Sequence, residues 1–268
     1  MSDATPEATT DAPIVAFFDV DNTLLRGASA FHLAKAARRM GILRSLEILK
    51  FCWHQATFLF VGENNKHLGS IKDRALVLIK GYTETELEDI ASGVFERDIE
   101  KRLWPETVGL TQEHLAKGHQ VWLISATPQI VGGVIAKRLG LTGALGTRFK
   151  AVGGVFTGDF DGPVLHGEDK AVAARAFAKA LGANLADCWA YSDSRNDIPL
   201  LSLVGNRVVV NPDARLTKHA KELHWPILHL KRASIREARK RVRRDAKATT
   251  SGKPPRRSDS KKALDLKA

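Results

Sequence analysis

Two pairs of aspartates follow apolar stretches of the sequence, and their spacing suits chemistry at a charged site. Asp19 and Asp21 come directly after one apolar run. Asp193 and Asp197 come after another. Two carboxylates about 4 Å apart repel each other by about 4 kcal/mol at an effective dielectric constant of 20. If the four groups converge in the fold, a cation must therefore lie among them.

The apolar runs have the composition of buried strands in a parallel sheet. Residues 14–18 form an unbroken apolar run rich in β-branched and aromatic side chains, which is typical of a strand buried on both faces. Residues 121–124, 188–191 and 208–210 predict further strands. In an open α/β sheet, ligands bind beyond the carboxyl ends of the strands. We therefore predict an α/β fold that brings the four acids to one edge of its sheet.

Ser125 and Lys170 are two further polar residues whose positions suggest a role. Ser125 ends the apolar run 121–124, and Pro128 then opens a predicted helix, so that a hydroxyl and free backbone N–H groups are offered to an anion. A helix-capping role would also explain this serine. Lys170 precedes an Ala-rich helix predicted over residues 171–181, and a lysine in such a place is ordinarily just solvated.

The order of these residues resembles the motifs of a known enzyme family. The Asp-x-Asp-x-Thr of residues 19–23, then Ser125, Lys170, and the acids Asp193 and Asp197 are similar to the four motifs of the haloacid dehalogenase superfamily, in its phosphoserine-phosphatase-like branch. Most members of the superfamily are magnesium-dependent phosphohydrolases with an aspartate nucleophile. The resemblance implies a Rossmann-like parallel sheet core with an inserted helical cap, and a phosphatase that needs Mg²⁺.

The resemblance also implies a role for each motif residue. Asp19 would be the nucleophile that forms an aspartyl-phosphate, Asp21 the acid and base, and Lys170 the cation that contacts nucleophile and phosphate. Oxygen ligands together with a phosphate favour Mg²⁺. The implied metal site consists of Asp19, Asp21 through its main-chain carbonyl, Asp193, and Asp197 in support. The implied substrate-binding residues are Thr23, Ser125, Ala126 and Asn196.

The substrate is predicted only as a small phosphorylated metabolite. In phosphoserine phosphatases a glutamate nine residues after the nucleophile engages the substrate amino group, but this sequence has Ala28 there. Ala126 and Thr127 stand where the branch usually has two glycines, and Arg74 lies near the position of a cap arginine. A phosphotransferase or phosphomutase with the same site is one alternative function. A protein that binds RNA or membrane through its tail is the other.

The cap is predicted from a long segment with helical spacing. We expect residues 28–104 to form it, with helices over residues 42–61, 66–80 and 84–103, the last capped by Thr83. The amphipathic segment 42–61 suits core packing, with membrane contact as the alternative. The core would comprise residues 13–27 and 105–230, including an antiparallel hairpin over residues 155–163.

The two ends of the chain differ from its body in composition. Residues 1–12 are polar and acidic and predict a disordered leader rather than a secretory signal. The chain of 268 residues carries a net charge of +11, and residues 231–268 hold 15 Lys and Arg against 4 Asp and Glu, so the body is neutral. This basic tail is predicted to be disordered or partly helical, with Ile235, Ala238, Val242 and Ala246 on one stripe of a helix over residues 231–248.

The basic tail has three candidate roles. An anionic membrane surface or nucleic acid would attract the tail, although it has no aromatic residue for base stacking. A solvated tail that aids solubility is the alternative.

No apolar stretch reaches the ~18 residues of a membrane span. Cys52 and Cys188 match no disulfide framework or metal pattern, so we expect a cytoplasmic protein.

Overall fold

The computed structural model describes residues 12–39, 41, 76 and 79–250. The helices predicted over residues 42–61 and 66–80 lie almost entirely outside the described residues, as do the predicted leader and Arg74. The chain divides into two compact units, residues 1–230 and 231–268, and the second contains the helix α10 (Arg232–Thr250). In the described part of the chain, no helix is long and apolar enough to cross a membrane.

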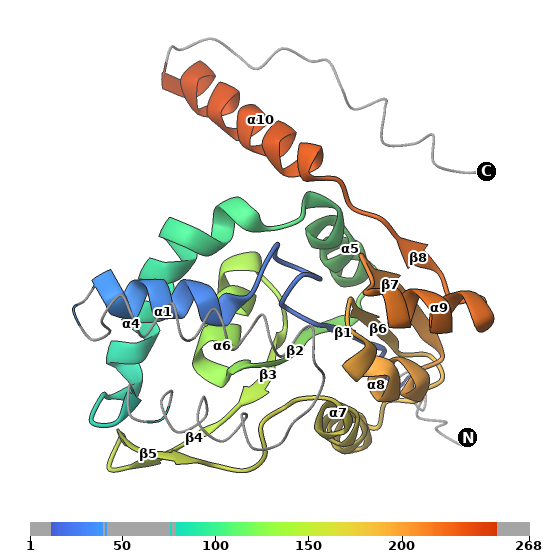
Figure 1. The fold of residues 1–268 in the computed structure, drawn as a ribbon, viewed down its shortest axis with the longest axis horizontal. Helices are drawn as coiled ribbons and strands as arrows, with labels where there is room; N and C mark the ends of the chain where they lie inside the picture. Colours follow the sequence, from blue (N-terminus) through green and yellow to red (C-terminus); the bar gives the residue numbers. More distant parts are fainter. Residues whose placement is uncertain (1–11, 40, 42–75, 77–78, 251–268) are drawn as a thin grey trace, which may run out of the picture. The chain divides into compact units, whose positions relative to one another are not determined.

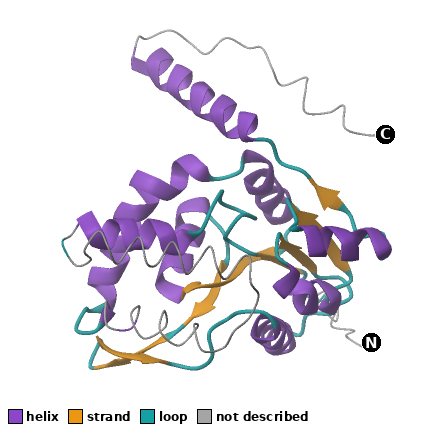
Figure 2. Ribbon diagram, in the orientation of Figure 1, coloured by secondary structure: helices purple, strands orange, loops and turns teal. Residues whose placement is uncertain are grey.

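A six-stranded parallel sheet forms the centre of the first unit (Figure 2). The strand order is β3-β2-β1-β6-β7-β8, so the chain extends the sheet on one side of β1 and then returns to extend it on the other. The strands are β1 (Val15–Phe18), β2 (Gln120–Pro128), β3 (Gly143–Thr147), β6 (Trp189–Ser192), β7 (Asn206–Val210) and β8 (Ile227–Leu228). This topology confirms the predicted Rossmann-like α/β class.

The alternating side chains of β1 fill two cores, one on each face of the sheet. Ala16 and Phe18 belong to one core, and Val15 and Phe17 belong to the other, where Phe17 meets the edge of Phe177 from α7. Helices on both faces complete these cores (Figure 1). They are α5 (Pro105–Ala116), α6 (Gln129–Leu139), α7 (Glu168–Leu181), α8 (Ile198–Leu203) and α9 (Ala214–Glu222).

The described part of the predicted cap segment is helical. It contains α1 (Ser29–Arg39) and α4 (Glu84–Val94), and α4 packs against both α1 and α6. Thr83 caps α4 as expected, in a reciprocal capping box with Glu86. The predicted helix over residues 84–103 continues past α4 as a π-helical turn (Phe95–Ile99) and a 3₁₀ turn (Glu100–Arg102). The division of the first unit into core and cap stays a prediction.

The hairpin lies earlier in the chain than predicted. Its strands are β4 (Phe149–Val152) and β5 (Val155–Phe160), and its turn is at Gly153 and Gly154, which both have positive φ. The predicted bounds of 155–163 are therefore wrong, because two adjacent glycines supply the left-handed backbone that a tight hairpin requires. The sequence analysis also missed β3, whose Gly143 lies so close to the Trp122 ring that a Cβ would come within 2.5 Å of it.

Candidate active site

The site lies where the carboxyl ends of β1, β2 and β6 meet (Figure 1). Asp19 directly follows β1 and Asp193 directly follows β6, its neighbour in the sheet. The Asp19 N–H continues the pairing of the two strands by donating to the Tyr191 carbonyl, at 2.9 Å. Ser125 lies near the end of β2 on the other side of β1. The strand order reverses here, which is where open α/β sheets bind ligands.

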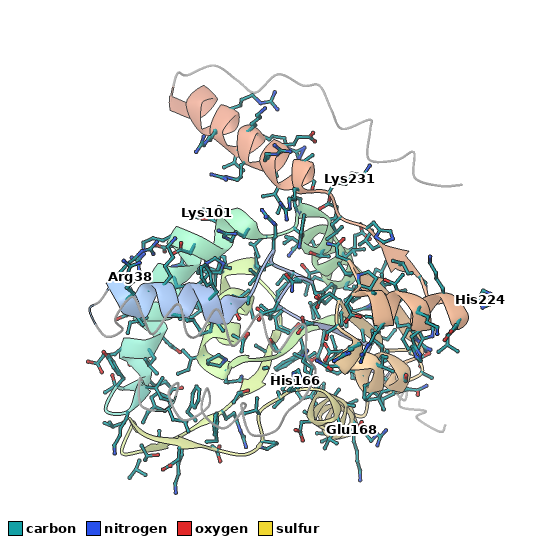
Figure 3. The ribbon with its side chains drawn as sticks, in the orientation of Figure 1. Arg38, Lys101, His166, Glu168, His224 and Lys231 are labelled. Carbon is teal, nitrogen blue, oxygen red and sulfur yellow. The ribbon has the colours of Figure 1, made fainter. Side chains whose placement is uncertain are left out.

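Lys170 connects the ends of two strands. It is carried by the first turn of α7, which begins after Gly167; Figure 3 labels the flanking His166 and Glu168. The Lys170 Nζ donates to Asp19 Oδ1 at 2.6 Å and to Asp197 Oδ2 at 2.7 Å. The side chain is buried, which excludes the ordinary alternative of a solvated lysine and agrees with the predicted contact between Lys170 and Asp19.

Asp197 has a second donor that helps to hold Lys170 in place. The Ser192 Oγ donates to Asp197 Oδ2 at 2.6 Å, and both side chains are buried. The same carboxyl oxygen thus accepts from Ser192 and from Lys170. This geometry makes Asp197 an anchor for the lysine, while its support of a metal ion stays a prediction.

The acids carry more negative charge than Lys170 balances. Burial raises the pKa of Asp19 to about 7, with Lys170 opposing the shift and Asp197 and Asp21 adding to it. Burial, and then Asp19 and Asp197, raise the pKa of Asp193 well above its ordinary value. Burial alone would lower the pKa of Lys170, but the Asp19 and Asp197 carboxylates outweigh it and raise that pKa. A buried acidic cluster with a single bound ammonium group therefore favours a further cation.

Mg²⁺ fits the donor set that the motifs provide. Among the described residues, no three His, Cys, Asp or Glu side chains form a ready-made metal cluster. The implied site needs fewer, because it takes the carboxylates of Asp19 and Asp193 and the carbonyl of Asp21, and leaves the other positions to phosphate and water. All these donors are oxygen atoms, and burial together with the neighbouring carboxylates raises the pKa of Asp19 and of Asp193, which a bound cation would oppose.

Asp21 and Thr23 lie in the turn after β1. The Ser29 N–H donates to Asp21 Oδ1 at 2.8 Å. Burial raises the pKa of Asp21, while the N–H and the hydroxyl of Ser29 oppose the shift. Thr23 is fully buried, and its Oγ1 lies 3.5 Å from Asp193 Oδ1, at the limit of a hydrogen bond. Thr23 therefore brings the first motif into contact with Asp193 of the fourth, and a direct contact with substrate stays a prediction.

The other predicted substrate-binding residues differ in exposure. Ser125 is buried, and its hydroxyl both donates to the Thr127 hydroxyl and accepts from the Thr127 N–H. Ala126 is exposed, and its carbonyl accepts from Thr147 Oγ1 at 2.8 Å. Asn196 is half-buried in the 3₁₀ turn Arg195–Asp197. Their proposed contacts with substrate remain untested predictions.

The sequence analysis gave no site role to three hydroxyl residues that the structure places here. They are Ser29, Thr127 and Ser192, and each lies within two residues of a motif position or at the start of the first cap helix. Ser29 is the first residue of α1. Two of these residues could have been found from the sequence. Ser192 directly precedes Asp193 and Thr127 lies two residues after Ser125, and short polar side chains at strand ends commonly form hydrogen bonds with neighbouring side chains or backbone.

The comparison with known families agrees with this geometry. The family model of the haloacid dehalogenase-like hydrolases matches residues 16–202, which include all four motifs. The chain belongs to this family. Membership in the haloacid dehalogenase-like hydrolases confirms the resemblance predicted from the motifs.

Individual relatives of this haloacid dehalogenase-like hydrolase support the same conclusion. Phosphoserine phosphatase SerB1 of Mycobacterium tuberculosis is 45% identical over 218 residues, which cover 81% of this chain and 71% of that protein. A crystal structure of a protein of unknown function from Bordetella pertussis has a TM-score of 0.71 at 25% identity, and covers 81% of this chain and 98% of that one. The predicted enzyme class, a phosphatase, is confirmed.

A more distant structure confirms the fold. A substrate-bound phosphoserine phosphatase has a TM-score of 0.57 at 22% identity, and the match covers 85% of this chain and 97% of that one. At this identity the likeness of the haloacid dehalogenase-like hydrolase to that structure concerns the fold alone. Substrate and cofactor are therefore matters for proposal.

Proposed function

We propose that this haloacid dehalogenase-like hydrolase is a Mg²⁺-dependent phosphomonoesterase that acts on a small phosphorylated metabolite through an aspartyl-phosphate. The observation that carries the proposal is the buried contact of Lys170 with Asp19, at 2.6 Å, beside Asp193 at the end of the neighbouring strand. A carboxylate that holds an ammonium group at a strand end is poised to meet an anionic phosphoryl group.

The proposed reaction has two steps, formation of the aspartyl-phosphate and its hydrolysis. Lys170 offsets negative charge, so the Asp19 carboxylate can attack phosphorus; the new Asp19 O–P bond forms as the bond to the leaving oxygen breaks, and Asp21 gives that oxygen a proton. A water molecule then attacks the aspartyl-phosphate, Asp21 takes its proton, and inorganic phosphate leaves with the carboxylate restored. Mg²⁺, when bound by Asp19, Asp193 and the Asp21 carbonyl, would supply further positive charge to the phosphoryl oxygens.

A phosphotransferase or phosphomutase remains the alternative for the same residues. It would differ in the second step, where an alcohol replaces water as the acceptor of the phosphoryl group. Added alcohols would then divert product from inorganic phosphate to a new phosphate ester, in proportion to their concentration. Unchanged release of phosphate in the presence of such acceptors supports the hydrolase.

The basic helix α10 suggests a binding partner for the second unit. Eight Lys and Arg and two acids occur within it. At 3.6 residues per turn, five of its exposed cations fall within a stripe about 100° wide; they are Arg232, Arg236, Arg239, Lys240 and Arg243. We propose that this stripe binds an anionic membrane surface by electrostatic attraction, because Ile235 is buried and the exposed Val242 offers too little apolar surface to insert deeply.

The replacement Asp19→Asn tests the catalytic proposal. We expect it to abolish phosphate release from phosphomonoesters in the presence of Mg²⁺, because an amide is a poor nucleophile, while the circular dichroism spectrum and a cooperative thermal transition still show a folded protein. Chelation of Mg²⁺ should have the same effect on the wild type. Asp169→Asn is the matched control, since that carboxylate is exposed on the first turn of α7. Near-wild-type turnover by folded Asp19→Asn protein would rule the mechanism out.

A further inference from the structure

Three buried hydroxyl groups form a chain between β2 and α1. The Ser125 Oγ donates to Thr127 Oγ1 at 3.0 Å, and Thr127 Oγ1 lies 2.7 Å from Ser29 Oγ. The exposed fractions of the three residues are 5%, 6% and 1%. Ser29 and Thr127 are 98 positions apart in the sequence, so this contact exists only in the folded chain.

Ser29 extends the chain to the proposed acid and base. Its backbone N–H donates to Asp21 Oδ1 at 2.8 Å, and its hydroxyl joins the N–H in lowering the pKa of Asp21 against the effect of burial. Ser29 is also the first residue of α1. A shift of Ser29 would therefore move the backbone donor that holds the Asp21 carboxylate.

The proton count of the hydroxyl groups gives the chain a direction. Each hydroxyl has one hydrogen to donate. Because Ser125 donates to Thr127, the Thr127 hydrogen is available to Ser29. Hydrogen bonds aligned in one direction strengthen one another in a buried site. This alignment depends on Thr127, because of the three hydroxyl groups only that of Thr127 contacts both of the others.

We propose that Thr127 is a positioning residue for acid–base catalysis, which it serves by holding Ser29 and thereby the Asp21 carboxylate. This inference rests on the proposed function, in which Asp21 protonates the leaving oxygen. The leaving group then decides how much Thr127 matters. An alkoxide needs a proton as it departs, whereas a nitrophenolate departs as a stable anion and gains little from a general acid.

The test compares kcat/KM for two substrates, glycerol 1-phosphate and p-nitrophenyl phosphate. The value of kcat/KM depends only on the steps up to departure of the leaving group. The later hydrolysis of the aspartyl-phosphate therefore does not affect it. For Thr127→Val, which keeps the shape and removes the hydroxyl, we expect kcat/KM to fall about 10-fold or more on the glycerol ester and to change little on the nitrophenyl ester. Thr127→Ser should restore the wild-type ratio between the substrates.

Two further variants keep the test sharp. Thr111→Val removes a buried hydroxyl from α5, where it bonds the Val108 carbonyl, and should leave the substrate ratio unchanged. Ser29→Ala breaks the same chain at its next link and should repeat the effect of Thr127→Val, which also covers the case of a Thr127 variant that does not fold. An equal loss on both substrates, or an unchanged ratio in both chain variants, would overturn the positioning role. A wild type that hydrolyses neither ester would instead overturn the proposed function.

Discussion

Lys170 gains its significance from the two carboxylates it reaches. Asp19 is 151 positions and Asp197 27 positions away in the sequence, yet both lie within 2.7 Å of its Nζ. Breaking a buried ion pair by removing one partner costs about 3–5 kcal/mol, because the other charge stays buried. Lys170 therefore holds two buried carboxylates together.

Ala28 leads to a prediction about the substrate amino group. We expect kcat/KM for phosphoserine to be about 10-fold or more below that for 3-phosphoglycerate, in which a hydroxyl replaces the ammonium group, because an ammonium buried without a carboxylate costs several kcal/mol. The two esters are compared directly by phosphate release. Ala28→Glu is the matched variant, and it should raise kcat/KM for phosphoserine relative to 3-phosphoglycerate.

The name of the 45% identical relative, a phosphoserine phosphatase, makes this comparison informative. If wild-type kcat/KM for phosphoserine exceeds that for every other phosphomonoester tested, the inference from Ala28 is wrong. Another acid would then have to supply the contact with the ammonium group.

At the scale of elements, Asp98 ties α1 to the π-helical turn after α4. The buried Asp98 carboxylate accepts from Arg39 at the end of α1, and the ammonium groups of Lys35 and Lys101 lie 3.5 Å and 3.9 Å from it. The hydrogen bond from Arg39 lowers the pKa of Asp98, and burial opposes the shift. The described part of the cap segment thus depends on one carboxylate shared by three half-exposed cations.

Replacing Asp98 tests this contribution to stability. Asp98→Asn should lower the free energy of unfolding in urea by about 1–2 kcal/mol, since the cations are exposed enough for solvent to screen them. Asp89→Asn, on the exposed side of α4, is the matched control and should have little effect.

The pH dependence of this effect has a definite sign. The folded state holds the Asp98 pKa below its ordinary value, so the stabilisation is complete above pH 4 and is lost as the pH falls through the folded pKa. The difference in unfolding free energy between the wild type and Asp98→Asn should therefore shrink below pH 4. A difference that grows on acidification would contradict the assignment.

At the scale of the whole molecule, charge and catalysis are carried by different units. The neutral residues 1–230 contain the site, and residues 231–268 carry the whole excess of +11. Each Lys or Arg near an anionic leaflet contributes about 1 kcal/mol, so even part of the α10 stripe would give measurable attachment.

Deletion of residues 231–268 tests the two units separately. We expect the truncated protein to turn over p-nitrophenyl phosphate at nearly the wild-type rate, but to lose salt-sensitive binding to vesicles that contain phosphatidylserine, measured by cosedimentation. Replacing Arg236, Arg239 and Arg243 by Gln should weaken that binding more than replacing Lys253, Arg256 and Arg257, which removes the same charge from outside the helix. Equal vesicle binding by full-length and truncated protein at low salt would exclude a membrane role for the tail.

Local patterns in the sequence were sufficient to predict four of the six strands of the sheet and to locate the acids at the ends of two of them. The apolar runs that form β1, β2, β6 and β7 are short and continuous, because a strand buried on both faces needs apolar side chains at successive positions. The acids directly after β1 and β6 were located because a strand end is itself a local feature. The strand β3 was not predicted. Its Gly143 packs against the Trp122 ring, which leaves no room for a side chain, and no local pattern in the sequence reveals that contact.

Contacts between distant residues decided the rest. The burial of Lys170, the bond from Ser192 to Asp197 and the hydroxyl chain through Thr127 depend on how β1, β2, β6, α1 and α7 come together. A hydroxyl or an ammonium group carries no sign in the sequence of which distant partner it will meet. The sequence by itself therefore determined which chemical groups this hydrolase presents at its strand ends, and the tertiary structure decided which of them touch, because side-chain contacts depend on distances in space rather than along the chain.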